Sequence, residues 1–342
     1  METVLFLLVD GLVNGAIYAQ VALSLVLIYT VTRVVNIAQG EYVMFGALTL
    51  ASFMERQIPA TLYLAVFGLA LWGGVEAWQR RRRPARAALV FAIFVLFAVA
   101  LAGMTFYALR ADSGLLISML ASVVLVAALG PAVYQFTVRP IAAGSTIVFV
   151  IVSVGIQMTM QGLGLLFWGA GSYPVAPITQ GDFLLGPAIV SYQSLWIAGI
   201  SIVMMASLYA FFEFTILGKA LRAAAVNRRG AQICGIPVTL AGGLSFALAA
   251  AFSAVSGMLV APMITANYEM GFNIGLKGFV GSALGGLVDY PLAIGGVLVV
   301  GALESYSAYS LSAYRDAIVF MLIIPILIWR NSRHEMAGYE EL

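Results

Sequence analysis

The chain has 342 residues, of which 62% are hydrophobic and 9% are charged, and its mean hydropathy is +1.02. Soluble domains carry roughly 25% charged residues, so this composition excludes a soluble globular protein. The net charge of +2 is small and the basic residues stand in short clusters, which argues against nucleic acid as a partner. With one cysteine, Cys234, and one histidine, His334, the chain lacks the residues for an internal disulfide and for the usual metal sites.

Apolar runs follow one another along nearly the whole chain. They cover residues 4–30, 36–55, 60–79, 87–109, 114–136, 145–169, 192–214, 239–262, 276–288, 291–310 and 315–330. The sequence therefore predicts an all-α, polytopic integral membrane protein, because a membrane-crossing helix needs about 20 apolar residues and such runs make about ten or eleven segments. We expect one transmembrane domain over residues 1–342 and a retained first helix, since no basic stretch precedes it and no cleavage site follows it.

Two of these runs are unlike plain membrane spans. Residues 36–55 open on the polar stretch Asn-Ile-Ala-Gln-Gly-Glu, and residues 276–288 contain Gly278, Gly281, Gly285 and Gly286. Both fit short, broken or re-entrant helices, which are tolerated at membrane depth only inside protein or along a water-filled path. The alternative is that the glycines only let helices pack closely, as the spacing Gly281-x-x-x-Gly285 allows.

The basic clusters predict the orientation, because cytoplasmic loops carry an excess of Lys and Arg. A periplasmic N-terminus and a cytoplasmic C-terminus place every cluster on the cytoplasmic side. The clusters are Arg33, residues 80–83 with Arg86, Arg139, the group Lys219, Arg222, Arg228 and Arg229, and Arg330 with Arg333. The arginine run at 80–83 indicates topology, with binding of lipid headgroups as the alternative.

Residues 215–237 form the most distinctive cytoplasmic stretch, with four basic residues and no acidic one. At about 100° per residue the basic side chains share one side of a helix and apolar ones the other, and Gly235 with Pro237 ends it. The basic side holds Lys219, Arg222 and Arg229; the apolar side holds Leu217, Leu221 and Ala224. Residues 217–236 are expected either to lie on anionic lipid or to dock a cytoplasmic protein.

Polar residues inside apolar runs are candidates for a translocation path, because they are costly in a membrane. Glu304 stands in an otherwise apolar run, where it either lines the path or forms an internal ion pair with Lys277 or Arg315. Gln157 and Gln161 share a helix face, and hydrogen bonding to another helix is favoured over contact with a solute. The candidate path residues are Asn36, Gln39, Glu41, Gln157, Gln161 and Glu304.

Several motifs resemble those of branched-chain amino-acid ABC transporter permeases. Gly218-x-Ala-Leu-Arg-Ala223, followed by Ala231 and Gly235-Ile236, is similar to that family's cytoplasmic loop. Residues 34–41 resemble its Asn-Phe-Ala-His-Gly-Glu signature, with Ile37 and Gln39 replacing Phe and His. The resemblance covers residues 4–56 and 114–330, including Gly275-Leu-Lys-Gly-Phe279, Gly301-x-x-Glu304 and Tyr314-Arg-Asp-Ala-Ile-Val-Phe320. Against that family, residues 60–110 look like an added helical hairpin, and its usual Arg-Pro and Gly-Leu ending is absent.

The resemblance implies the subunit of a bacterial inner-membrane importer for branched-chain or related amino acids. It implies a second, related permease, as a heterodimer, two cytoplasmic ABC ATPases, an extracytoplasmic solute-binding protein, and membrane lipid around the chain. The loop carries over as the ATPase-coupling site, with Gly218, Lys219, Arg222, Ala223, Arg229 and Gly235. The chain has no Gly-x-x-x-x-Gly-Lys-Ser/Thr loop and no His-Glu-x-x-His. We therefore expect no catalytic, cofactor or metal site in it, and ATP with Mg²⁺ bound by the partner ATPases.

Two other classes stay open. An ion-coupled secondary transporter would use intramembrane carboxylates and broken helices to bind solute and ion, and Glu304 alone favours it. In a channel or a purely structural membrane protein, the basic cytoplasmic segment would have no function.

Overall fold

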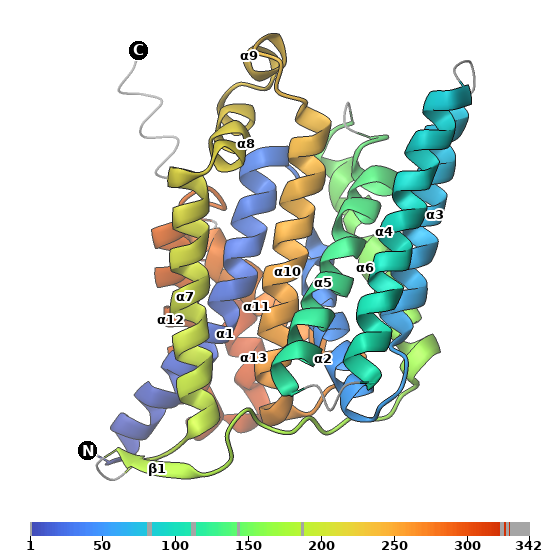
Figure 1. The fold of residues 1–342 in the computed structure, drawn as a ribbon. Helices are drawn as coiled ribbons and strands as arrows, with labels where there is room; N and C mark the ends of the chain where they lie inside the picture. The colour runs from blue at the N-terminus through green and yellow to red at the C-terminus, as the bar shows by residue number, and fades with distance from the viewer. Residues whose placement is uncertain are drawn as a thin grey trace, which may run out of the picture.

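The computed structural model describes residues 2–80, 84–110, 114–141, 144–185 and 188–321, with the single positions 325 and 328. Within them the chain is a bundle of helices running mostly along one direction (Figure 1). The α-helices are α1 (Glu2–Thr32), α2 (Glu41–Met54), α3 (Ala60–Gln79), α4 (Pro84–Arg110), α5 (Leu115–Val133), α6 (Thr146–Trp168), α7 (Tyr192–Phe214), α8 (Ile216–Val226), α9 (Arg228–Ile233), α10 (Val238–Ile264), α11 (Met270–Leu284), α12 (Tyr290–Ser310) and α13 (Arg315–Met321).

Shorter elements link these helices. The 3₁₀ turns η1 (Ile37–Gly40) and η3 (Ser312–Tyr314) lead into α2 and α13, and the π-helical η2 (Tyr134–Val138) follows α5 shortly after the internal Pro131. A two-stranded antiparallel hairpin of β1 (Asp182–Leu185) and β2 (Ala188–Ser191) lies between α6 and α7. This hairpin was not predicted from the sequence, because strands this short leave no apolar run of their own.

The predicted all-α, polytopic class is confirmed. Among the described residues, eight helices are long and apolar enough to cross a membrane. The shorter α2, α11 and α13 occupy the remaining predicted apolar runs. Helix α2 has 14 residues and α11 has 15, so each rises about 21–23 Å and falls short of the roughly 30 Å hydrocarbon core.

Helices α1 and α10 form the centre of the bundle. Beyond its exposed first turns, α1 is buried, and it packs mainly against α12, α10 and α11 (Figure 1). Helix α10 packs against α5, α1 and α2. A helix that is apolar all round suits either a buried core or a lipid-facing position. Sequence periodicity therefore does not distinguish the buried α1 from α4, which is almost entirely exposed on the surface.

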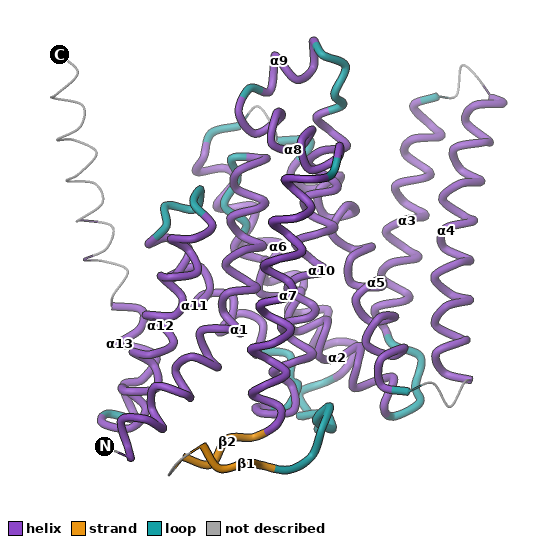
Figure 2. The backbone as a smooth tube through the Cα atoms, turned by 60° about the vertical axis from the view of Figure 1, so that its left-hand side comes forward, coloured by secondary structure: helices purple, strands orange, loops and turns teal. Residues whose placement is uncertain are grey.

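The segment 60–110 forms the α3–α4 hairpin at the edge of the bundle, well separated from α7 and α12 (Figure 2). Helix α4 packs chiefly on α3, and α3 reaches the body through α5. Ion pairs hold one end of the hairpin: Glu76 pairs with Arg80 at 3.1 Å and with Arg139, beside η2, at 3.7 Å.

Glycines allow the central helices to approach at backbone distance. A methyl group on Gly257 of α10 would collide with the carbonyl oxygen of Val43 in α2, and one on Gly130 of α5 would collide with that of Phe246 in α10. In η1, just before α2, Gly40 stands against Gly271 and Gly275 of α11.

The structure corrects the bounds of the helix that was predicted over residues 276–288. Helix α11 starts six residues earlier, at Met270, because its weakly apolar first turns pack on η1, whereas residues 285–288 form the turn before α12. Gly281 and Gly285 pack against Val297 and Ala293 of α12, which confirms the close-packing interpretation for this pair.

The bundle has two distinct ends. Helices α8 and α9 stand at one end, where Arg33 contacts Ala225 of α8, and where Arg80 and Arg139 line a cavity together with residues of α8. The N-terminal end of α1 and the β-hairpin lie at the opposite end (Figure 1). Residues 81–83, 330 and 333 of the predicted basic clusters lie outside the described residues.

Candidate functional site

Residues 217–236 form two short helices, α8 and α9, and not one continuous helix. The Thr215 hydroxyl caps α8 by accepting from the Gly218 N–H at 2.9 Å. Asn227 has an extended backbone, and its side chain accepts from the Gly230 N–H at 2.9 Å to cap α9. The chain therefore breaks between α8 and α9 at Asn227, because asparagine favours the start of a helix over its interior.

Helix α8 is seated on the end of α7 through Gly218. A methyl group there would run into the carbonyl oxygen of Phe211 and lie 2.7 Å from the Cα of Phe212. Leu221 and Ala224 continue this buried face. Helix α8 therefore lies directly against the backbone of α7.

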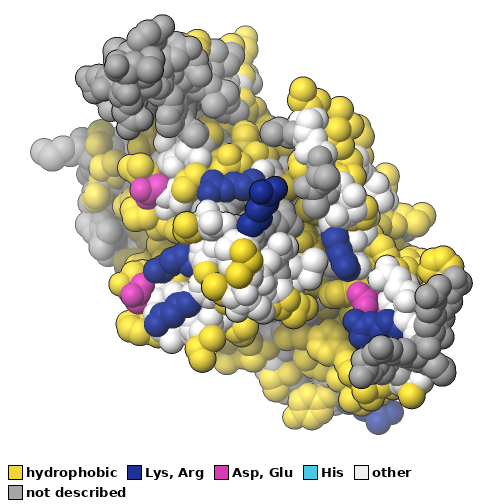
Figure 3. Space-filling model, turned by 90° about the horizontal axis from the view of Figure 1, so that it is seen from above, with side chains coloured by type: hydrophobic (Ala, Val, Ile, Leu, Met, Phe, Trp, Pro, Cys, Tyr) yellow, Lys and Arg dark blue, Asp and Glu magenta, His cyan; other side chains and the backbone are white. Residues whose placement is uncertain are grey.

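The opposite face of this segment is exposed. Five of the six predicted coupling residues lie on it: Lys219, Arg222, Ala223, Arg229 and Gly235. Large apolar side chains accompany them, with Ile216 87%, Val226 81% and Ile233 88% exposed. Figure 3 looks onto this end and shows basic side chains gathered there with hydrophobic ones between them. Leu217, which the helical pattern placed on the buried side, is 59% exposed.

Two arginines hold this segment to the membrane helices. Arg222 donates from both terminal nitrogens to one oxygen of Glu213 in α7, at 3.3 Å each. Arg33, at the end of α1, donates to the carbonyl oxygen of Ala225 at 3.4 Å.

The first buried polar cluster joins α1, α11 and α12. Lys277 pairs with Glu304 at 2.6 Å and with Asp316 at 2.9 Å, and the Tyr18 hydroxyl donates to the other oxygen of Glu304 at 2.5 Å. Arg315 approaches Glu304 at 3.7 Å. Two cations thus balance two carboxylates. The contacts of Glu304 are those of the internal ion pair that the sequence offered as an alternative.

The second buried cluster joins η1 and α2 to α6. Gln157 of α6 donates to one oxygen of Glu41 at 3.1 Å and to the side-chain oxygen of Gln161 at 3.1 Å. Glu41 is fully buried, and its second oxygen has no hydrogen-bond partner among the described residues. That oxygen points to the first turn of α11, 3.0 Å from where a methyl group on Gly271 would stand.

Asn36 and Gln39 tie the turn before α2 to α10. The Asn36 amide donates to the Gln39 side-chain oxygen at 3.2 Å. Gln39 in turn donates to the Ala249 carbonyl oxygen at 2.9 Å and to the Ser253 hydroxyl at 2.8 Å. The structure therefore gathers the predicted path residues into two neighbouring groups around η1, and it places Glu304 in a separate network.

The end that carries the β-hairpin has loops braced against the bundle. Tyr173 and Ala266 exchange backbone hydrogen bonds of 2.8 and 2.9 Å, which joins the loop after α6 to the loop after α10. Gln193 of α7 accepts from the Ile178 N–H and donates to the Leu259 carbonyl oxygen. The sequence analysis did not single out Gln193, because a lone amide at a helix start has no distinguishing pattern.

Comparisons with known proteins find relatives along nearly the whole chain. The family model described as branched-chain amino acid transport system / permease component matches residues 7–327. The high-affinity branched-chain amino acid transport system permease protein BraD of Pseudomonas aeruginosa is 24% identical over 336 residues, 94% of this chain and 92% of BraD. The permease protein LivH of Escherichia coli strain K12 is 25% identical over 328 residues, 93% of this chain and 91% of LivH.

No solved structure matches the chain, so the family is established by sequence. The family match begins within α1, at residue 7, and ends beyond α13, at residue 327. It includes both buried polar clusters and the α8–α9 segment. This protein therefore belongs to the family of branched-chain amino acid transport system permease components.

Proposed function

We propose that the chain is the membrane-spanning subunit of an ATP-driven importer in a bacterial inner membrane, with the α8–α9 end in the cytoplasm. The observation that carries the proposal is the exposed face of α8 and α9. Large apolar side chains at a water-facing tip are costly to leave uncovered, and arginines beside them suit a protein partner. A helix lying on lipid alone would bury those apolar side chains in the membrane.

The coupling residues have distinct tasks in this proposal. Gly218 seats α8 on α7, Arg222 fixes it through Glu213, and Lys219, Ala223, Arg229 and Gly235 face the ATPase. Two ABC ATPases bind ATP and Mg²⁺, and their closure moves α8 and hence α7. A second, related permease completes the path, and a solute-binding protein docks at the end with the β-hairpin.

The path in this proposal runs past η1 and α2, where Asn36, Gln39, Glu41, Gln157 and Gln161 lie. An extended stretch and a 3₁₀ turn precede α2, so the backbone here is irregular at membrane depth, which is tolerated only inside protein or along a water-filled cavity. The free oxygen of Glu41 suits the ammonium group of a small zwitterionic solute. The printed names of the relatives support branched-chain amino acids as that solute.

The competing ion-coupled transporter loses its main support, because Glu304 is neutralised by Lys277 inside the bundle. The decisive assay is uptake of radiolabelled leucine into sealed vesicles. Vesicles with the permeases alone and a proton or sodium gradient are expected to show no uptake, and uptake there would overturn the ATP-driven proposal. Vesicles with the full complex and internal ATP are expected to take up leucine when loaded binding protein is added.

A double variant tests the docking face. Gly218→Leu displaces α8 from α7, and Arg222→Glu sets a carboxylate against Glu213. We expect ATPase stimulation by loaded binding protein to fall at least about tenfold, the effect of losing one well-placed contact, with normal membrane insertion. Arg110→Glu, at the opposite end of the bundle, is the control and should retain stimulation. Normal transport by the double variant would contradict the coupling role.

A further inference from the structure

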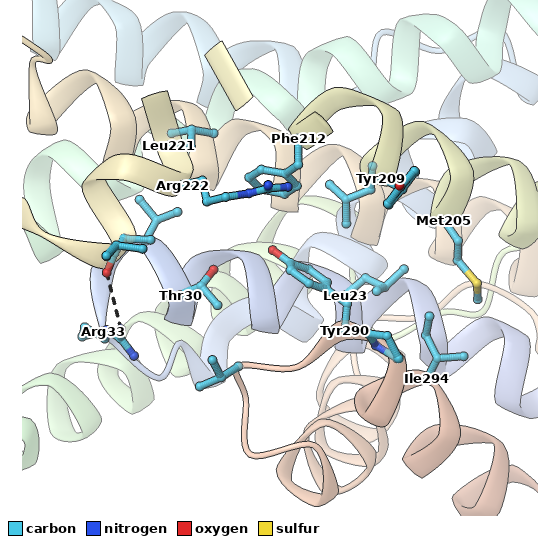
Figure 4. A pocket seen from close by; sticks show the side chains of 16 residues that line it. Leu23, Thr30, Arg33, Met205, Tyr209, Phe212, Leu221, Arg222, Tyr290 and Ile294 are labelled. Atoms are coloured by element: carbon cyan, nitrogen blue, oxygen red, sulfur yellow. Dashed lines mark hydrogen bonds between the residues drawn. The ribbon is translucent and has the colours of Figure 1, made fainter. Parts of the chain in front are cut away.

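An elongated cavity of about 560 Å³ lies between α1, α7, α8 and α12, apart from the two buried polar clusters. Figure 4 shows its two unlike ends. Leu23, Met205 and Ile294 line the end inside the bundle, whereas Arg33 and Arg222 stand at the end beside α8. We call this cavity the α1–α7 slot.

The charges around the slot favour an anion at one end. Arg33 and Arg222 are its charged lining residues, and both are exposed. Among the residues that the structure describes, Arg33 donates to one carbonyl oxygen, at 3.4 Å, so most of its donors are available. Glu213 pairs with Arg222 but is not among the lining residues, and Lys219 adds a positive charge on the same helix. The mouth of the slot therefore presents positive charge and unused guanidinium donors.

The dimensions fit one acyl chain in one leaflet. Leu23 lies in α1, and Arg33 directly follows the end of that helix, ten residues further along the chain. The slot therefore runs about 15 Å along the helix axis. Half of a hydrocarbon core of roughly 30 Å is the same length. The slot is open at its side and mouth, since Tyr209 is 66%, Val288 48% and Val226 81% exposed.

We propose that the α1–α7 slot binds an anionic phospholipid of the leaflet next to α8. One acyl chain occupies the apolar length from the mouth of the slot to its inner end at Leu23 and Ile294. The phosphate accepts hydrogen bonds from Arg33 and Arg222. Arginine recognises phosphate through its planar fork of donors, and an apolar wall excludes a free hydrophilic solute. The site depends on this geometry alone and stands whether or not ATP drives transport.

Native mass spectrometry of the purified protein tests the headgroup end. Phosphatidylglycerol and phosphatidylcholine with identical acyl chains are offered in equal amounts. We expect about tenfold greater retention of phosphatidylglycerol, because both lipids carry the phosphate but the choline cation of phosphatidylcholine is repelled by the two guanidinium groups, at a cost of about 1.4 kcal/mol. Arg33→Gln with Arg222→Gln should abolish this preference. Lys219→Gln with Arg229→Gln removes the same charge from residues that do not line the slot, and it should retain the preference.

A second measurement tests the apolar end of the slot, first in the wild-type protein. Phosphatidylglycerol with a diazirine at the end of one acyl chain should crosslink, in the wild-type protein, to peptides containing Met205 or Ile294. Ile294→Trp fills the slot and should remove this crosslink while both arginines remain. Equal retention of the two lipids, loss of preference in the Lys219/Arg229 control, or crosslinks only elsewhere would overturn the proposal. Displacement of the lipid by a second permease subunit would also overturn it, since the slot would then be a protein interface.

Discussion

Two buried carboxylates in this protein have opposite surroundings. Glu304 accepts from the Lys277 ammonium and the Tyr18 hydroxyl. Glu41 has one amide donor, and its other oxygen has no partner within the described part of the chain. Removing one member of a buried ion pair leaves the other charge without compensation, which is strongly destabilising. Neutralising a carboxylate that lacks a cation removes a cost instead. The two residues should therefore respond differently to the same substitution.

We expect Glu304→Gln to lower the thermal unfolding midpoint, corresponding to a loss of about 3 kcal/mol, because Lys277 then has only the half-exposed Asp316 as a counterion. Glu41→Gln should leave the midpoint unchanged or raise it, yet reduce leucine uptake at least about tenfold through loss of the ammonium contact. Fluorescence-detected unfolding in detergent and vesicle uptake measure the two effects. A drop in the midpoint for Glu41→Gln, with uptake retained, would assign Glu41 a structural role.

At the scale of elements, glycine contacts determine which helices can adjoin. Gly257 of α10 touches the backbone of Val43, whereas Gly199 of α7 has open space around it. We expect Gly257→Leu to destabilise the protein by about 3 kcal/mol or more, the upper range for overpacking. Gly199→Leu should change nothing measurable. Unfolding midpoints of the two variants check this, and equal midpoints would show that α2 and α10 can separate without cost.

Sequence reasoning located helices well, because every apolar run corresponds to one, but it did not locate their neighbours. Both α1 and α4 are apolar enough to cross a membrane, although most of α1 is buried and most of α4 is exposed. In lipid both environments are apolar, so hydropathy carries no signal that separates them. The start of α11 was also misplaced, since its first turns are stabilised by the glycine contacts with η1 and not by their own apolar character.

The candidate site was predictable to a different extent in each part. Helical spacing predicted the exposed cations on α8 and α9, and opposite charge predicted Lys277 as a partner of Glu304. The exposure of Ile216, Val226 and Ile233 was not predictable, because an apolar residue in a membrane protein is expected to be covered. The contact of Gln157 with Glu41 joins residues 116 apart in the chain, which local pattern cannot reveal.

At the scale of the whole molecule, orientation is testable with the one cysteine of the chain. Cys234 is exposed, just after α9. In intact cells with a permeabilised outer membrane, a membrane-impermeant maleimide should leave it unlabelled, and in inverted vesicles it should label it. The variant Cys234→Ser with Gln180→Cys moves the thiol to the exposed loop at the other end and should give the reverse pattern. Labelling of Cys234 in intact cells would place α8 and α9 in the periplasm.

The backbone contacts among α2, α5 and α10 have a kinematic consequence. At three places a glycine of one helix lies directly against the backbone of another, because the glycine has no side chain there. The pairs are Gly257 with Val43, Gly46 with Ala254 and Gly130 with Phe246. Sliding any of these helices by one residue would bring a Cβ atom against a carbonyl, so shear between them is blocked. The three helices must turn together as one rigid block. Any alternation between outward and inward openings then has to occur at the borders of this block, where α6 and α7 meet it through fewer contacts.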